Sequence, residues 1–203
     1  MKIICIGRNY ANHAKELKND LPTEPVIFLK PDTALLKDNG DFYLPSFSNN
    51  IHYELELIVK INKNGKKIDE KFAHKYFDEI SVGIDFTARD KQDELKQKSL
   101  PWELAKAFDN SAVIGNFIPK NEFEDLQNIQ ISMQKNNKLV QQGNTKDMLF
   151  NIPKIISFVS QFITLRPGDI IFTGTPEGVG KVEIGDMLTG FIEDKKLFEC
   201  RIK

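Results

Sequence analysis

The sequence predicts an α+β domain that is predominantly β. Most apolar residues fall in short runs rich in Ile, Val and Phe that stop at Gly, Pro or Asn, which is the pattern of short strands. Helical composition is limited to a few short segments between these runs. The 203 residues contain no repeat, linker or low-complexity segment, so we expect a single domain over residues 1–203.

Charge and hydropathy limit the classes of partner. The formal net charge is -1, which argues against a broad basic face for nucleic acid or anionic lipid and favours a small-molecule partner. The apolar run at the N-terminus stops at Gly7 and is too short for a signal-peptide core, and no later run has transmembrane length. We therefore expect a cytoplasmic protein without membrane association. Cys5 and Cys200 are expected to be reduced, partly buried thiols.

The first third of the chain predicts two strands around a helix. Ile3–Ile6 has the composition of a buried strand, and Asn9–Leu17 that of a helix with Asn9 as its N-cap. Val26–Lys30 is a second short strand closed by Pro31. Its last residue, Lys30, either points into solvent or presents an ammonium group to an anionic site.

His13 and Glu16 are three residues apart in the predicted helix, so their side chains share one face. A carboxylate beside an imidazole can orient a histidine base. The same spacing also suits an ordinary salt bridge on a solvated helix, and local sequence alone favours that alternative.

The strand predicted over His52–Ile61 carries the most informative pattern. Acidic and bulky apolar residues alternate in it, which places Glu54 and Glu56 on one face and apolar neighbours on the other. Their Cα atoms would be ~7 Å apart. Two carboxylates at that separation repel each other unless a cation lies between them, although a plain surface strand can also carry alternating glutamates.

A second strand, Ile80–Thr87, embeds Asp85 among apolar residues. A buried aspartate is costly unless a cation or hydrogen-bond donors offset its charge. Together with Glu54 and Glu56, Asp85 would complete an all-oxygen ligand set. Such a set suits Mg²⁺, Mn²⁺ or Ca²⁺ rather than zinc, because neither cysteine nor paired histidines accompany it.

The remaining predicted elements are short helices, a hairpin and a glycine-rich loop. Ala73–Phe77 and Ala88–Lys98 are expected to be helical, the second exposed and with Arg89 and Gln92 on one face. Lys106 has the local setting of an ordinary helix charge. Further along, Asn136-Asn137 predicts a hairpin turn, Asn151 opens a helix that runs to Phe162, and a buried strand leads into the loop 173–180. The glycines of this loop suit close backbone approach to a neighbouring strand or ligand rather than a phosphate cradle.

Seven separated motifs together resemble the fumarylacetoacetate hydrolase family, in its small acylpyruvate hydrolase and oxaloacetate decarboxylase branch. The resemblance runs nearly from end to end. The motifs are Gly7-Arg8-Asn9-Tyr10 with His13 and Glu16, Leu29-Lys30-Pro31, Glu54-x-Glu56, Gly83-x-Asp85-x-Thr87-x-Arg89-Asp90-x-Gln92, Trp102-x-x-Ala105-Lys106-x-Phe108, Asn144-Thr145-x-Asp147-Met148 and Thr173-Gly174-Thr175-Pro176-x-Gly178-Val179-Gly180.

The resemblance implies a mixed β-roll with a short N-terminal lid helix, a homodimer, and one Mg²⁺ or Mn²⁺ per subunit, for which Ca²⁺ can substitute. By position it implies Glu54, Glu56 and Asp85 as metal ligands. It further implies His13, Glu16 and Lys106 as catalytic residues, and these substrate-binding residues: Arg8, Lys30, Arg89, Gln92 and Thr175.

The implied substrate is a small 2-oxo acid. The leading expectation is hydrolysis of the C–C bond of short acylpyruvates, with decarboxylation of oxaloacetate through the same enolate. An isomerase or hydratase of dienoic 2-oxo acids is the alternative, and a non-catalytic Ca²⁺-binding module is a more remote one. Two departures from the family pattern stand out. Residues 109–115 lack the Gly-Pro-Trp turn of homoprotocatechuate-pathway isomerases and decarboxylases in this family, which argues against that activity. Glu177 stands where many relatives carry a small residue and is expected to alter chain-length preference at the pocket mouth.

Overall fold

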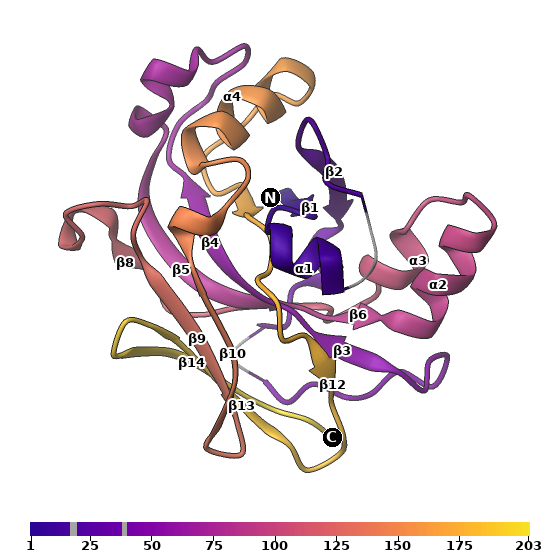
Figure 1. The fold of residues 1–203 in the computed structure, drawn as a ribbon. Coiled ribbons are helices and arrows are strands. Elements are labelled where there is room, and N and C mark those ends of the chain that lie inside the picture. The colour runs from indigo at the N-terminus through magenta and orange to yellow at the C-terminus, as the bar shows by residue number, and fades with distance from the viewer. Residues whose placement is uncertain (17–19, 38–39) are drawn as a thin grey trace.

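The computed structural model describes residues 1–16, 20–37 and 40–203 and has the predicted α+β, predominantly β class (Figure 1). The strands are β1 (Ile3–Gly7), β2 (Val26–Lys30), β3 (Ile51–Tyr53), β4 (Leu55–Ile61), β5 (Phe77–Asp85), β6 (Thr87–Ala88), β7 (Ala112–Ile114), β8 (Ile118–Pro119), β9 (Gln130–Lys135), β10 (Lys138–Asn144), β11 (Ile170–Phe172), β12 (Gly180–Lys181), β13 (Met187–Ile192) and β14 (Lys195–Arg201). The α-helices are α1 (Ala11–Glu16), α2 (Arg89–Gln97), α3 (Glu103–Lys106) and α4 (Ile152–Phe162), joined by short 3-10 turns that include Glu70–Lys75.

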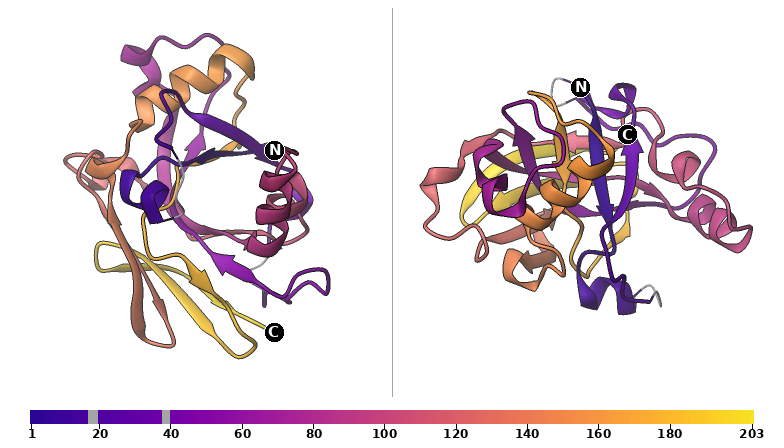
Figure 2. Two further views of the ribbon diagram at one scale, coloured as in Figure 1. Left: turned by 45° about the vertical axis from the view of Figure 1, so that its right-hand side comes forward. Right: turned by 90° about the horizontal axis from the view of Figure 1, so that it is seen from above.

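The strands form three sheets. The largest has seven strands in the order β2-β1-β11-β4-β5-β7, with β8 paired to β5, and it is mixed because β1 and β11 run parallel while their neighbours run antiparallel. A four-stranded sheet has the order β10-β9-β13-β14, and a small one the order β12-β3-β6. The large sheet curls strongly, with the four-stranded sheet below it, α4 above it and α2 and α3 at its side (Figures 1 and 2).

Side-chain alternation divides the large sheet into two apolar faces. Leu57 of β4 and Val82 of β5 belong to the main core, which also takes in α4 and the four-stranded sheet. Ile58 and Cys5 belong to a smaller cluster on the opposite face. Because alternate residues of a strand share a face, Glu56 lies on the same face as Ile58, beside the smaller cluster.

The strand predicted over His52–Ile61 is divided at Glu54. The residues before the break, β3, leave the large sheet and pair with β6 and β12, whereas β4 stays in it. The backbone oxygen of Glu54 accepts a hydrogen bond from Asp85 N at 2.9 Å. The break therefore gives Glu54 a direction that differs from that of a regular strand residue and holds it beside the end of β5.

The N-terminal helix also differs from its prediction. It begins at Ala11, and Asn9 does not cap it: the Asn9 amide donates to the backbone oxygens of Phe150 and Thr173 and accepts from Phe150 N. Asn9 thereby fixes the start of the helix to the end of β11. The predicted end of this helix at Leu17 lies outside the described residues.

Elsewhere the predicted elements are present with small shifts. The helix expected over Ala73–Phe77 is the 3-10 turn Glu70–Lys75, because the Asp69 side chain accepts from Lys71 N and starts the turn earlier. The hairpin turn at Asn136-Asn137, with both residues at positive φ, and the start of α4 at the Asn151 cap are confirmed. No helix in the described part of the chain is long and apolar enough to cross a membrane.

Gly83 of β5 allows β5 to pack closely against its neighbours β4 and β7 in the large sheet. A Cβ at this position would lie 2.0 Å from the backbone oxygen of Val113 and 2.4 Å from Cδ1 of Ile58.

Because the backbone of Val113 cannot move away without disturbing the sheet, we predict that Gly83→Ala lowers the free energy of unfolding by about 3 kcal/mol or more. Gly185→Ala is the control: φ is +96° there but a Cβ meets nothing within 4 Å, so the loss should be about 1–2 kcal/mol. Denaturant unfolding measures both, and equal losses would contradict this packing.

Candidate active site

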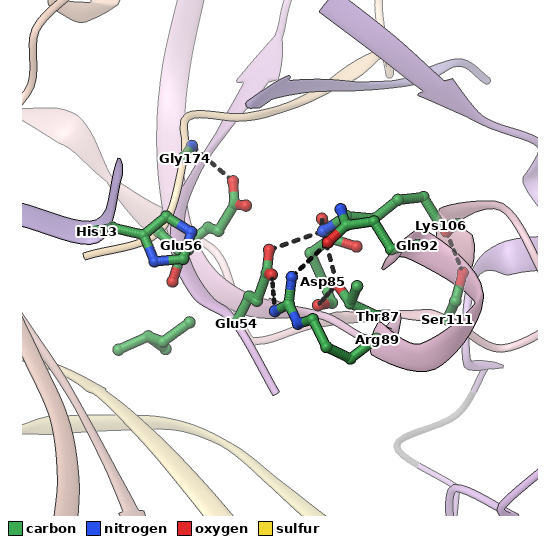
Figure 3. Close-up of polar contacts among 12 residues, drawn as sticks. His13, Glu54, Glu56, Asp85, Thr87, Arg89, Gln92, Lys106, Ser111 and Gly174 are labelled. Atoms are coloured by element: carbon green, nitrogen blue, oxygen red, sulfur yellow. Dashed lines mark hydrogen bonds and ion pairs between the residues drawn. The ribbon is translucent and has the colours of Figure 1, made fainter. Parts of the chain in front are cut away.

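Three acidic side chains converge where β4 and β5 meet on the charged face of the large sheet. Glu56 comes from β4, Asp85 from the last position of β5, and Glu54 from the break before β4. Carboxylate oxygens of the three lie within 4.8 Å of one another. Their relative exposures are only 4%, 2% and 0% for Glu54, Glu56 and Asp85, so water screens their repulsion very little (Figure 3).

Three buried cations surround this carboxylate triad. Lys106, at the end of α3, donates to Glu54 Oε2 at 2.7 Å, to Asp85 Oδ2 at 2.6 Å and to Thr87 Oγ1 at 2.6 Å. Arg89, at the start of α2, donates to the other Glu54 oxygen. Lys30 Nζ lies 2.7 Å from Asp85 Oδ1. The three formal negative charges of the triad are thus equalled in number by three positive charges, which lie against Glu54 and Asp85.

This matching is uneven. Burial by itself raises the pKa of Glu54, but Lys106 and Arg89 outweigh it and hold that pKa well below its usual range. Burial raises the pKa of Glu56 well above its usual value, and Asp85 and Glu54 raise it further. Among the described residues Glu56 forms no ion pair, and its hydrogen bond comes from the neutral Gly174 N at 2.6 Å. Negative charge at Glu56 is therefore the least compensated in the site.

The donor set fits a divalent cation. Asp85 Oδ1 is fully buried and, although close to Lys30, accepts no aligned hydrogen bond from any residue that the structure describes. Glu56, which forms no ion pair among the described residues, adds a further carboxylate. Carboxylate oxygens are the ligands that Mg²⁺ and Mn²⁺ prefer. Glu54, Glu56 and Asp85 are the residues that would hold such an ion.

His13 and Glu16 meet above the triad as their spacing predicts. His13 Nδ1 lies 3.1 Å from Glu16 Oε2, and His13 is 5% exposed. The other Glu16 oxygen accepts from Gly178 N at 3.2 Å, so α1 is fastened to the glycine-rich loop. When Nδ1 carries the proton donated to Glu16, the remaining ring nitrogen, Nε2, has a free lone pair.

The glycine-rich loop approaches its neighbours as closely as the sequence suggests. A Cβ on Gly174, where φ is +103°, would lie 2.6 Å from Asn9 Cβ. Only glycine can therefore bring this backbone N–H to Glu56. Glu177, in the same loop, accepts from Asn12 Nδ2 at 3.1 Å on the lid helix and does not line the cavity, so the structure gives no support to its expected role at the pocket mouth.

These groups enclose one cavity. It leaves ≈ 30 Å³ for the centres of water-sized groups, which is room for an ion and a water or two. The lining residues include the triad and these others: Arg8, His13, Phe28, Arg89, Gln92, Lys96, Trp102, Lys106 and Thr175.

Two predicted site residues stand behind this lining. Glu16 reaches the cavity only through His13. Lys30 is fully buried beneath it, where it donates to the backbone oxygen of Lys106 and to Ser111 Oγ at 2.9 Å. We therefore place Lys30 as a group that positions Lys106 and Asp85 rather than one that touches substrate.

Other groups of the site were not singled out from the sequence. Thr87 and Ser111 hold Lys106 through its Nζ and its backbone oxygen, and Gln141 holds Thr175 at 2.7 Å. Lys96 lines the cavity from α2. No local sequence pattern could have identified Thr87, Ser111 or Gln141 as site residues. Lys96 could have been identified, because it lies seven residues after Arg89 and therefore on the same face of the predicted helix.

Nearby cations offset the charge of Glu54 but not that of Glu56, so replacing each glutamate by glutamine should change the stability of the protein in opposite directions. In metal-free protein at pH 7, Glu56→Gln should raise the free energy of unfolding by about 1–3 kcal/mol, because it removes a buried carboxyl group whose raised pKa costs stability at that pH. Glu54→Gln should lower it by about 3 kcal/mol or more, because Lys106 and Arg89 lose their partner. Thermal and denaturant unfolding with a chelator measure both changes.

The pH dependence follows from the direction of the Glu56 shift. A raised pKa in the folded state costs stability above the ordinary glutamate pKa, and that cost disappears below it. The stability gained by Glu56→Gln should therefore shrink as the pH falls from 7 toward 4.5. The assigned charges would be contradicted if the stability gained by Glu56→Gln grew as the pH falls. They would also be contradicted if Glu54→Gln and Glu56→Gln changed the free energy of unfolding in the same direction.

Comparison with known proteins finds relatives along nearly the whole chain. The family model described as fumarylacetoacetate (FAA) hydrolase C-terminal matches residues 2–203. The mitochondrial oxaloacetate tautomerase of Homo sapiens is 45% identical over 184 residues, which are 91% of this chain and 83% of that protein. The mitochondrial oxaloacetate decarboxylase of Dictyostelium discoideum is 44% identical over 188 residues, 92% of this chain and 86% of that one.

A solved structure extends the similarity to the fold. The crystal structure of fumarylpyruvate hydrolase from Pseudomonas aeruginosa, in complex with Mn²⁺ and pyruvate, superimposes with a TM-score of 0.93 at 36% sequence identity and covers 100% of this chain and 89% of that one. Family model, sequence relatives and fold together show that this chain belongs to the fumarylacetoacetate hydrolase family.

Proposed function

We propose that this chain is a Mg²⁺- or Mn²⁺-dependent enzyme of short 2-oxo acids whose main reaction interconverts the keto and enol forms of oxaloacetate. One observation carries the proposal: a buried carboxylate triad shares its cavity with a histidine held by a carboxylate and with a buried lysine. Sequence reasoning placed C–C hydrolysis first. The names of the tautomerase and decarboxylase relatives move oxaloacetate to the front.

The triad supplies the place for the ion. A divalent cation at Glu54, Glu56 and Asp85 would bind the carboxylate and keto oxygen of a 2-oxo acid and polarise its carbonyl group. Gly174 N–H keeps one Glu56 oxygen in place, and Lys30 stands behind Asp85. These contacts fix the acids before substrate arrives.

His13 is the group that moves a proton. It lines the cavity, and Glu16 holds its Nδ1, so Nε2 is free to take a proton from the carbon beside the keto group or to return one to it. This transfer at carbon is the step that interconverts keto and enol forms. In Figure 3 the triad lies between His13 and Lys106, so the two groups act from different sides.

Lys106 acts as a fixed positive charge. Burial lowers its pKa, but Asp85 and Glu54 more than reverse this and raise the pKa above its usual value. A lysine that stays protonated cannot serve as the base. It stabilises the negative charge that develops on substrate when His13 removes a proton.

Hydrolysis of acylpyruvates and decarboxylation of oxaloacetate are the second candidate reactions. Both pass through the same enolate, and the solved fumarylpyruvate hydrolase is similar over the whole chain. In hydrolysis, His13 would instead take a proton from the attacking water. The isomerase or hydratase alternative uses the same groups, whereas a Ca²⁺-binding module would need neither the His13–Glu16 pair nor buried Lys106.

We also propose that the protein is a cytoplasmic homodimer, as the family resemblance implies. Large apolar side chains at the surface are candidates for the interface between subunits, since contiguous exposed apolar area often marks one. The most exposed of them include Tyr43, Leu104, Phe162 and Ile184. Size-exclusion chromatography with light scattering tests the assembly.

The first experiment separates the candidate reactions. Purified protein with Mg²⁺, and with excess chelator, is given enol oxaloacetate, keto oxaloacetate and acetylpyruvate. Mg²⁺-dependent decay of the enol absorbance without pyruvate formation supports tautomerisation; pyruvate from the second or third substrate supports decarboxylation or hydrolysis. Absence of all three activities in protein that binds Mg²⁺ would refute the proposal.

His13→Ala should lower kcat for oxaloacetate tautomerisation by about 100-fold or more, because a positioned base contributes roughly that factor. The Kd for Mg²⁺ from calorimetry should change less than threefold, since His13 is not among the proposed ligands. His74→Ala, a histidine of the exposed turn Glu70–Lys75, should leave both quantities unchanged. Full activity in His13→Ala would remove His13 from the mechanism.

A further inference from the structure

Two cationic side chains line the cavity without an ion-pair partner among the described residues. Arg89 and Lys106 are committed to Glu54 and Asp85. The side chains of Arg8 and Lys96 also line the cavity, yet neither side chain forms an ion pair or hydrogen bond with another residue in the described ranges 1–16, 20–37 and 40–203. Partly enclosed cations without a counterion are costly. Their presence here points to an anion that arrives with the substrate.

The backbone directs Arg8 into this place. Arg8 has φ +59°, the left-handed region that a side chain other than glycine rarely adopts. Its guanidinium carbon lies 5.5 Å from the centre of the Trp102 ring, which is a cation–π contact. Stacking leaves the N–H groups at the guanidinium edge free to donate. A strained residue held by an aromatic wall is consistent with a functional position.

Lys96 reaches the cavity from one face of α2. Arg89, Gln92 and Lys96 are spaced by three and four residues, so they lie on the same side of the helix, and all three line the cavity. The other lysine of α2, Lys91, does not line the cavity, and its Nζ pairs with Glu94 Oε2 at 2.6 Å. Burial lowers the pKa of Lys96, and Arg89 and Arg8 lower it further, so this ammonium gains from a nearby anion.

The charges of the cavity favour an anion with two carboxylates. The triad is already offset by Lys30, Arg89 and Lys106. A divalent ion then leaves an excess of positive charge, to which Arg8 and Lys96 add. A 2-oxo acid with one carboxylate would place its negative charge at the triad and leave these two cations without a partner.

We propose that Arg8 and Lys96 form a subsite for a second carboxylate, so that the chain selects 2-oxo diacids over 2-oxo monoacids. This inference rests on the proposed function, since it assumes that the 2-oxo acid end lies at the triad. It names the substrate class of the site and assigns Lys96 a role in specificity. Oxaloacetate meets the requirement, and an acylpyruvate meets it only if its acyl end carries a carboxylate, as fumarylpyruvate does.

A matched pair of ligands tests the subsite. Oxaloacetate and 2-oxobutyrate have the same four-carbon chain and differ only in a terminal carboxylate against a methyl group. Trp102 is the single tryptophan of the chain and lines the cavity, so its fluorescence reports binding in the presence of Mg²⁺. We expect oxaloacetate to bind about 10- to 100-fold more tightly than 2-oxobutyrate, the range for one hydrogen-bonded charge pair.

Lys96→Met should reduce this preference about tenfold or more while the Kd of 2-oxobutyrate changes less than twofold, and Lys96→Arg should restore most of it. The control is Lys98→Met, which removes a lysine paired with Glu94 at 2.7 Å just beyond α2 and outside the cavity; it should keep the full preference. Arg8→Met should lower kcat/KM for oxaloacetate in the same way as Lys96→Met.

Equal affinities for the two acids in the unmodified protein would overturn the subsite, and so would a Lys96→Met variant that weakens both alike. The outcome is separable from that of the proposed function. A Lys96-dependent preference without turnover would support the subsite and refute the proposed reaction. Normal oxaloacetate tautomerisation without any preference would do the reverse.

Discussion

Repulsion among Glu54, Glu56 and Asp85 is the constraint on which the rest of the site depends. Three carboxylates within 4.8 Å of one another and almost without solvent are tolerable only because Lys30, Arg89 and Lys106 lie against them. The cations are bound to Glu54 and Asp85, which leaves Glu56 with a neutral donor. A divalent ion at the triad would relieve this imbalance, because it would bring positive charge to Glu56.

The fold brings the triad and its cations together through glycines and a strand break at a few positions rather than through long regular helices or strands. Gly83 lets β7 approach β5, Gly174 brings its N–H to Glu56, and the break at Glu54 turns that carboxylate toward Lys106. Asn9 ties the start of the lid helix to the end of β11. The proposed catalytic residues and metal ligands therefore come from four separate segments: α1, the break with β4, β5 and α3.

Much of this was predictable from local chemistry. Alternation identified Glu54 and Glu56 as neighbours on one face, an acid within an apolar strand identified Asp85, and spacing paired His13 with Glu16. The combined motifs then gave the family. Alternation could not reveal the division of the strand at Glu54, because the pattern continues through the break and only tertiary pairing of β3 with β6 and β12 decides it.

The roles of the buried and the unpaired lysines were beyond local sequence. Lys30 ends a strand, and local sequence left open whether it points into solvent or toward an anionic site. It is enclosed by Lys106, Ser111 and Asp85, which lie 55 to 81 residues further along the chain. In the sequence Lys96 looks like any other lysine of a charged helix, whereas in the structure it lines the same cavity as Arg8 and Trp102. Long-range contacts of this kind leave no periodic trace in the sequence.

The central claim is that the triad is a metal site, and a crystal grown with Mn²⁺ and oxalate tests it most directly. We predict an anomalous difference peak about 2.0–2.3 Å from one oxygen of each of Glu54, Glu56 and Asp85, with oxalate on the open side of the ion. A fully formed triad without such a peak, or a Mn²⁺ ion bound only elsewhere, would contradict the account.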